Sequence, residues 1–140
     1  MSSSEGKRAR HYKHLFLWVA QSWLAMFYLG AGYAKITQPR DLLTALMTWP
    51  GQVNLDLVQA IGWIEVALAV GLVAPLLSWP KLRDLLLMSA AALMLYASCM
   101  AGYHAAQKDL ALSIVNGFLT VLAVAVLAGR SARREGGSPL

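Results

Sequence analysis

Four long apolar segments dominate this 140-residue chain and limit what it can fold into. Each is close to the roughly 20 residues that an α-helix needs to cross about 30 Å of hydrocarbon. Charged residues make up only 14% of the chain, whereas a soluble domain has about 25%. The sequence therefore predicts an all-α, polytopic membrane protein with spans at about Leu15–Ile36, Leu57–Leu77, Leu85–Tyr103 and Leu110–Gly129.

The basic residues are unevenly divided between the two sides that these spans define. Most of the 12 Lys and Arg residues precede the first span, separate the second from the third, or follow the fourth. Short loops rich in Lys and Arg remain in the cytoplasm, so we expect both termini there, in a bacterial inner (plasma) membrane. This bias, together with attraction to anionic headgroups, explains the net charge of +5 without any nucleic-acid partner.

The domain boundaries follow from the same pattern. Residues 1–14 form a basic cytoplasmic tail, which is expected to be disordered or to lie on the headgroups. Residues 15–130 form the four-helix transmembrane domain, and residues 131–140 form a flexible C-terminal tail.

The loop between the first two spans carries its own helical signals. Pro39 suits the first turn of a helix, Asp41 suits a helix N-terminus, and leucines recur at helical spacing until Trp49-Pro50-Gly51 stops the run. We expect a short interfacial helix there that caps the bundle. The other two connections are short, so consecutive spans are expected to pack as an antiparallel four-transmembrane-helix bundle.

The reactive side chains that most enzymes need are scarce in this chain. Cys99 is the single cysteine, which excludes both an intrachain disulfide and a CxxC redox pair. His11 and His14 are three residues apart, but two ligands in a basic tail make a poor metal site. We therefore expect no catalytic constellation, no metal site and no cofactor encoded by the chain alone.

Glu65 lies within the otherwise apolar second span. An ionisable group in a span costs about 2.5–3.5 kcal/mol on insertion scales, so it normally faces the bundle interior and a partner. Counting from Leu57, its depth is about 12 Å from the outer face. The polar residues Lys35, Gln59, His104 and Asn116 belong to the same outer half of the membrane.

These residues predict an outward-facing polar pocket with Glu65 at its floor. Lys35 could reach down toward Glu65 because a lysine stem extends along apolar surface while its ammonium stays in polar surroundings. The ligand or proton site candidates are Lys35, Gln59, Glu65, His104 and Asn116, and the wall candidates are Tyr28, Tyr33, Trp63, Tyr96 and Met100. The alternative is that Glu65 is locked in a buried pair that fixes helix register.

The cytoplasmic half of the membrane has almost nothing comparable in the sequence. Gln21 and Ser22 lie in that part of the first span, and we expect them to bond to neighbouring helices.

Two short motifs resemble those of the DoxX and DoxX-like membrane proteins. They are Gly32-Tyr33-Ala34-Lys35-Ile36 at the end of the first span and Gly62-Trp63-Ile64-Glu65, followed by Gly71-Leu72, in the second. The resemblance covers about residues 15–130 and implies a four-helix inner-membrane bundle with Lys35 and Glu65 at matching family positions. One departure is that relatives often carry an Arg near the start of the first span, where this chain has Gln21 and Ser22.

The resemblance also implies a role beside redox enzymes. Founding members of the family are associated with quinone-linked oxidation, as a subunit of a thiosulfate:quinone oxidoreductase. We therefore expect an accessory subunit of a quinone-linked or other redox system, with a quinone as candidate ligand and a soluble or membrane redox partner. Such a chain would not be an enzyme by itself, and its oligomeric state is left open.

Two alternatives remain open at this point. One is a structural or assembly subunit of the membrane without a ligand. The other is a small proton-coupled transporter, although small multidrug transporters carry their membrane Glu in the first span and Glu65 lies in the second.

Overall fold

The computed structural model describes residues 3–131, which are almost entirely helical and contain no strand. Four helical stretches are long and apolar enough to cross a membrane: Glu5–Thr37, Leu55–Leu76, Lys81–Ala106 and Leu110–Ser131. The chain is therefore an integral, multi-pass membrane protein, as predicted. Its elements are α1 (Ser3–Thr37), α2 (Arg40–Met47), the 3-10 helix η1 (Trp49–Gln52), α3 (Leu55–Val73), the 3-10 helix η2 (Ala74–Leu76), α4 (Trp79–Ala106) and α5 (Leu110–Ser131).

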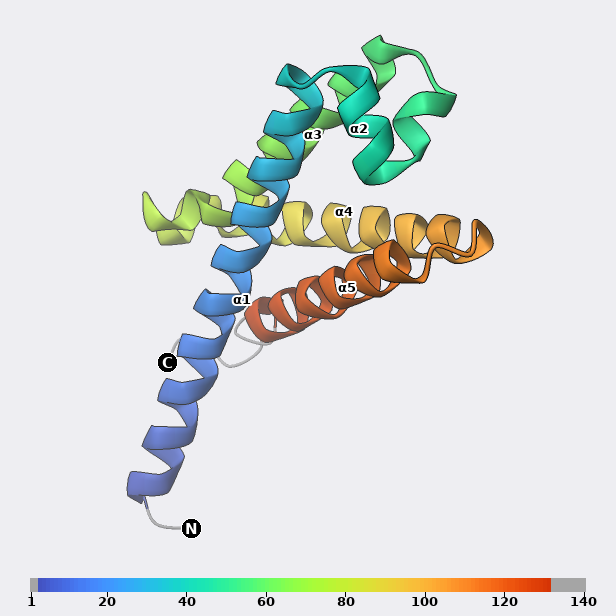
Figure 1. Cartoon of the computed structure of the whole chain (residues 1–140). Helices are drawn as coiled ribbons and strands as arrows, with labels where there is room; N and C mark the ends of the chain where they lie inside the picture. The colour runs from blue at the N-terminus through green and yellow to red at the C-terminus, as the bar shows by residue number, and fades with distance from the viewer. Residues whose placement is uncertain (1–2, 132–140) are drawn as a thin grey trace.

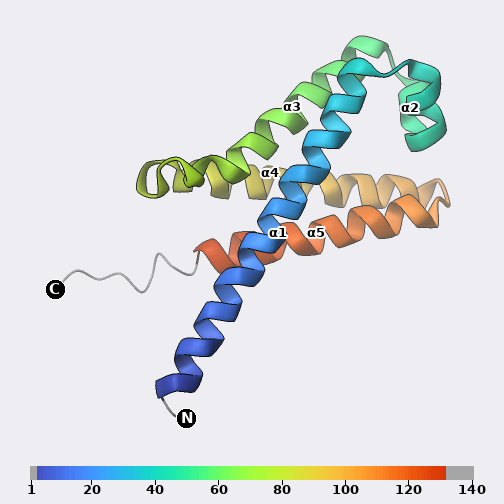
Figure 2. The same cartoon turned by 60° about the vertical axis from the view of Figure 1, so that its left-hand side comes forward.

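The four spans form two antiparallel hairpins that cross one another (Figure 1). One hairpin is α1 with α3, the other is α4 with α5, and both views show the two pairs running in different directions (Figure 2). The hairpins touch through α3 against α4 and through α1 against α5. Because they diverge from this crossing, an angle opens between them, and α2 lies in that angle. We refer to this side of the bundle as the α2 end and to the opposite side as the basic end.

Each span buries one narrow stripe of side chains, which we term its seam. In α3 the seam residues are spaced alternately by four and three positions: Val58, Gly62, Glu65, Ala69 and Leu72. This spacing keeps one helix face toward a partner at a small crossing angle. The seam of α4 follows the same rule and ends on a histidine, with the buried residues Leu86, Ala90, Leu93, Ala97 and His104.

Glycines mark the points where the helix backbones approach most closely. A Cβ atom at Gly32 would lie 2.6 Å from the Gly62 carbonyl oxygen, and one at Gly62 would lie 2.8 Å from the Gly32 carbonyl oxygen. These two glycines therefore form the α1–α3 crossing, because only a residue without a side chain fits there. Gly71 lies against Ser89 of α4, and Gly129 of α5 lies against Leu17 of α1.

The segment α2–η1 is folded onto the spans and held by hydrogen bonds. Arg40 donates to the carbonyl oxygens of Pro50, Gly51 and Val53, which fastens the start of α2 to the end of η1. Leu43 of α2 and Trp49 of η1 are buried in one cluster with Val58 of α3. The short helix predicted between the first two spans is thus present, and its apolar side packs on the bundle.

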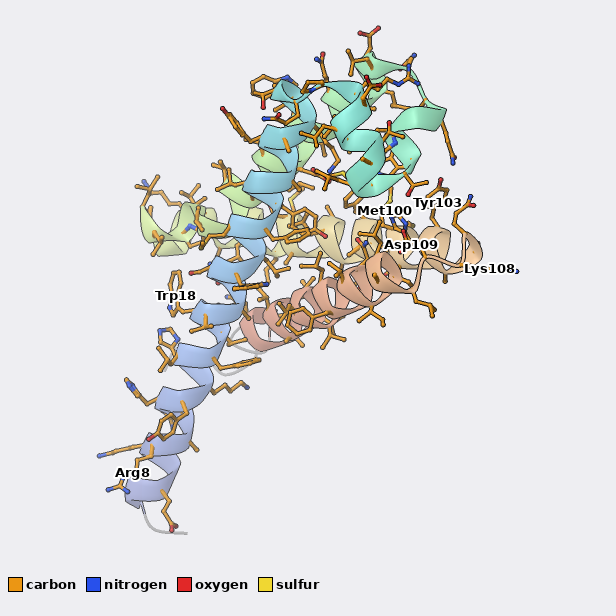
Figure 3. All side chains as sticks on the ribbon, viewed as in Figure 1. Arg8, Trp18, Met100, Tyr103, Lys108 and Asp109 are labelled. Atoms are coloured by element: carbon orange, nitrogen blue, oxygen red, sulfur yellow. The ribbon has the colours of Figure 1, made fainter. Side chains whose placement is uncertain are left out.

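The basic N-terminal segment is helical over residues 3–14, which leaves the alternative that it lies on the headgroups. It continues α1 without a break. Figure 3 shows Arg8 on the part of α1 that projects beyond the other helices, with Met100, Tyr103 and Asp109 near the α2 end. The predicted flexible tail lies outside the described residues, apart from Ser131.

The glycine crossing leads to a stability prediction. Gly32→Ala places a Cβ atom against backbone, so the helices must separate, and we expect the thermal midpoint in detergent to fall by several degrees. Gly30→Ala is the matched control, because a Cβ atom there meets nothing within 4 Å and alanine favours helix. Equal midpoints for the two variants would contradict the role of Gly32.

Candidate functional site

Lys35 and Glu65 form a buried ion pair between α1 and α3. The Lys35 Nζ atom lies 2.8 Å from Oε1 and 2.7 Å from Oε2 of Glu65. The two residues are only 3% and 2% exposed. Glu65 is therefore neutralised by a partner at the depth where an isolated carboxylate would be most costly.

Helix direction explains why these two side chains meet. Each charged residue follows its crossing glycine by three positions, Lys35 after Gly32 and Glu65 after Gly62, and so shares its face of the helix. Side chains in a helix lean toward the helix N-terminus. Because α1 and α3 are antiparallel, Lys35 leans toward the basic end and Glu65 leans toward the α2 end, which brings their heads together.

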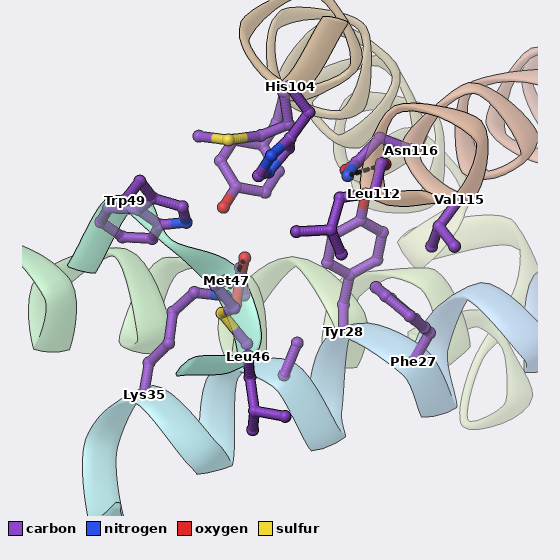
Figure 4. Close-up of a pocket in the computed structure, with 14 residues that line it drawn as sticks. Phe27, Tyr28, Lys35, Leu46, Met47, Trp49, His104, Leu112, Val115 and Asn116 are labelled. Carbon is purple, nitrogen blue, oxygen red and sulfur yellow. Dashed lines mark hydrogen bonds and ion pairs between the residues drawn. The ribbon is translucent and has the colours of Figure 1, made fainter. Parts of the chain in front are cut away.

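A cavity of about 150 Å³ lies beside the ion pair (Figure 4). All four spans contribute to its wall, as does the α2–η1 segment, and α3 contributes through Glu65 alone. The lining is mainly aromatic and aliphatic, with a few polar groups. The lining residues are Phe27, Tyr28, Ala31, Lys35, Leu46, Met47, Trp49, Glu65, Tyr96, Met100, His104, Leu112, Val115 and Asn116.

Two buried polar atoms on this cavity have no hydrogen-bond partner within the described part of the chain. They are the Tyr28 hydroxyl and Nδ1 of His104, on residues that are 1% and 3% exposed. Nδ1 of His104 lies 3.9 Å from the Asp109 carboxylate, which is beyond hydrogen-bond distance. An unsatisfied buried polar group costs about 1–3 kcal/mol, so two such groups on one cavity are unusual for a site that only stabilises the fold.

Asn116 and Tyr96 are two further polar residues on the cavity. The Asn116 amide donates to the Leu112 carbonyl oxygen on its own helix, over 2.8 Å. The Tyr96 phenol lies near the Glu65 carboxylate, and its ring lies next to that of Tyr28. Both carboxylate oxygens of Glu65 accept from Lys35.

The structure gathers some of the predicted site residues on the cavity and separates others from it. Lys35, Glu65, His104 and Asn116 line it, as do the wall candidates Tyr28, Tyr96 and Met100. Gln59, Tyr33 and Trp63 do not line this cavity. Successive helical residues are about 100° apart, which turns Tyr33 and Trp63 away from the Lys35–Glu65 face, and both are exposed.

Sequence reasoning missed the contribution of α2 and η1 to the cavity wall. Leu46, Met47 and Trp49 all line it, although the sequence indicated only a cap on the bundle. Phe27 and Ala31 were also missed, and helical spacing could have found them, since they precede Lys35 by eight and four residues.

A second buried polar cluster lies toward the basic end, where almost none was expected. The Gln21 amide donates to the Leu72 carbonyl oxygen over 2.5 Å and accepts from Nε of Arg130 over 3.2 Å. The Arg130 guanidinium also lies 4.8 Å from the centre of a Trp18 ring. Gln21 therefore bonds to neighbouring helices as predicted, whereas Ser22 is exposed.

Helix ends explain why this second cluster is needed. The last carbonyl groups of a helix have no partner within it, and Leu72 lies at the end of α3. Arg83 performs a similar task for α5 by donating to the Arg130 carbonyl oxygen over 2.8 Å. The cluster therefore provides hydrogen-bond donors for the last carbonyl groups of α3 and α5. The sequence signal for the burial of Gln21 is that it shares one face of α1 with Tyr28 and Lys35, at seven-residue spacing.

Comparison with known proteins gives one match. A family model described as "DoxX-like family" matches residues 19–126, which includes both glycine motifs and at least part of each of the four spans. No curated protein matches the chain, and no solved structure does.

The ion pair leads to a double-mutant prediction. Lys35→Met and Glu65→Met each leave one buried charge without its partner, which costs about 3–5 kcal/mol of unfolding free energy. The double variant buries no charge, so we expect it to lose much less than the sum of the single variants. Denaturant titration in detergent measures all three free energies, with Lys81→Met as an exposed control. Additive losses would contradict direct coupling between Lys35 and Glu65.

Proposed function

The chain belongs to the DoxX-like family, and we propose that it binds a small lipid-soluble molecule with two oxygen substituents, of the quinone class, in the cavity beside Lys35 and Glu65. The observation that carries this proposal is the pair of unpartnered atoms, the Tyr28 hydroxyl and Nδ1 of His104, on one cavity. A ligand that bonds to both would remove the cost of burying them.

The size and chemistry of the cavity support a single substituted ring. A cavity of about 150 Å³ lined by apolar side chains holds a benzene-sized molecule in other proteins, and this cavity has the same volume. The Tyr28 hydroxyl can donate to a quinone carbonyl. His104 can donate to the second carbonyl or accept from a quinol hydroxyl, depending on which ring nitrogen carries the proton.

The Lys35–Glu65 pair has a structural role in this proposal. Its atoms are engaged with one another, so it forms one wall of the cavity and fixes α1 against α3, while Tyr28 and His104 bond to the ligand. The same pairing favours the alternative that the chain is an assembly subunit without a ligand. It does not favour a proton-coupled transporter, since both carboxylate oxygens of Glu65 are engaged with Lys35.

A redox role requires a partner to supply or remove electrons. The single cysteine provides no dithiol couple within the chain, so the proposed role is that of a non-catalytic subunit that presents a quinone to a soluble or membrane oxidoreductase. The uneven basic residues support cytoplasmic termini in a bacterial inner membrane. In that orientation the α2 end and the cavity lie in the outer half of the bilayer.

Equilibrium binding tests the proposal. Purified protein in nanodiscs is titrated with ubiquinone-1 and with a short-chain menaquinone, and we expect saturable binding of at least one. Tyr28→Phe removes a single hydroxyl and should weaken binding about three- to tenfold, the net value of one hydrogen bond. Tyr33→Phe is the matched control on the same helix, because Tyr33 is exposed and does not line the cavity.

Two results would count against this function. Binding of neither quinone to the wild-type protein would refute it, and equal weakening by both tyrosine variants would show that the cavity is not the site. Recovery of a stoichiometric partner in mild detergent by a protein that binds neither quinone would instead support the assembly alternative.

A further inference from the structure

The cavity has an apolar rim that faces sideways, toward the lipid. Three of its lining residues are exposed: Phe27 of α1 at 39%, Leu46 of α2 at 56% and Val115 of α5 at 39%. Those that α3 and α4 contribute are buried or half-buried. Figure 4 shows Phe27 and Val115 on the side of the cavity away from Trp49 and Lys35. The exposed rim of the cavity is therefore formed by α1, α2 and α5.

The path from the water at the α2 end is covered. The α2–η1 segment supplies Leu46, Met47 and Trp49 to the cavity wall. Arg40 fastens this segment to itself through three carbonyl groups, and the Tyr103 hydroxyl ties it to α4 by donating to the Gln52 side chain over 2.8 Å. The exposed lining residues of α1 and α5, Phe27 and Val115, are apolar, whereas Met47 and Trp49 cover the cavity toward the α2 end.

A second hollow lies on the same two helices, next to this rim. It is a groove of about 310 Å³ whose floor is the buried pair Ala20 and Leu122 and whose walls are the exposed residues Phe16, Val19, Trp23 and Phe118. Every lining side chain is hydrocarbon except for the indole nitrogen of Trp23. The groove is therefore shaped for a hydrocarbon chain.

The groove continues from the rim along both helices. Trp23 precedes Phe27 by four residues in α1, and Phe118 follows Val115 by three residues in α5, so each wall residue lies about one turn from a rim residue on the same face. From Phe27 to Phe16 the path is about 16 Å long at 1.5 Å per residue. The groove thus begins about one helical turn from the rim of the cavity on both α1 and α5.

We propose that the ligand enters the cavity from the bilayer between α1 and α5, and that its hydrocarbon chain occupies the groove between Trp23 and Phe118. This inference rests on the proposed function and narrows its substrate class to ring compounds that carry a long apolar chain, such as isoprenoid quinones. A ring without a chain would fill the cavity but leave the groove to bulk lipid.

Two quinones that share one ring separate the contributions of cavity and groove. The probes are 2,3-dimethoxy-5-methyl-1,4-benzoquinone, which has no chain, and its decyl derivative, decylubiquinone, both titrated into the full chain in nanodiscs. Trp23→Ala and Phe118→Ala each remove one wall of the groove. We expect either substitution to weaken decylubiquinone binding about five- to tenfold and to leave binding of the chainless quinone unchanged.

Trp63→Ala is the matched control, because Trp63 is an exposed tryptophan on α3, away from cavity and groove. Unchanged binding of the chainless quinone shows that each variant is folded. Unchanged decylubiquinone binding in both groove variants, or an equal loss in Trp63→Ala, would overturn the groove assignment while leaving the proposed function intact. If the wild type binds neither probe, the groove assignment is overturned, and if it also binds no short-chain menaquinone, the proposed function itself is refuted.

A change of oligomeric state identifies another occupant of the groove. The size of each variant in detergent is compared with that of the wild type. If Trp23→Ala dissociates an oligomer without weakening decylubiquinone binding, the groove is an interface between copies of the chain, and the assignment to a ligand chain is overturned.

Discussion

The close crossing of α1 and α3 at Gly32 and Gly62 is the constraint on which the remaining structure depends. Without side chains at this point, the two backbones come near enough for Lys35 to reach Glu65 across the interface. The ion pair then makes a buried carboxylate tolerable, because each charge satisfies the other in a low-dielectric setting. The two Gly-x-x-charge motifs therefore act together: the glycines let the helices approach closely, and the charged residues form the ion pair between them.

The cavity is a consequence of how the second hairpin meets the first. Since α4 and α5 cross α1 and α3 (Figure 1), the spans cannot fill the angle between them at the α2 end, and α2 with η1 closes it in part. Tyr28 and His104 face the remaining space from different hairpins. Neither hairpin alone would bring their unpartnered polar atoms together, so the proposed ligand contacts are a property of the assembled bundle.

Much of this arrangement could be predicted from the sequence, because lipid imposes simple rules. Span length revealed the four helices, and matched depth brought together Lys35, Glu65, His104 and Asn116. Depth alone does not separate Tyr33 and Trp63, which are exposed, from the residues that line the cavity, because the angle around the helix also decides where a side chain points. Nothing local in the sequence shows that Arg130 is buried or that Gln21 of another helix accepts its hydrogen bond. The crossing of the hairpins depends on contacts between helices, such as Gly71 of α3 with Ser89 of α4, and the sequence does not indicate which residues pair in this way.

The position of both charges within the first hairpin has a consequence for biosynthesis. Lys35 and Glu65 are separated by 30 residues, so both are synthesised before α4 begins. Each alone would oppose transfer into the bilayer by a few kcal/mol, but as a hairpin they can enter as a neutral pair. The first two spans can therefore insert before the last two are synthesised. His104 and Asn116, which lie in the last two spans, then join a hairpin that is already in the membrane.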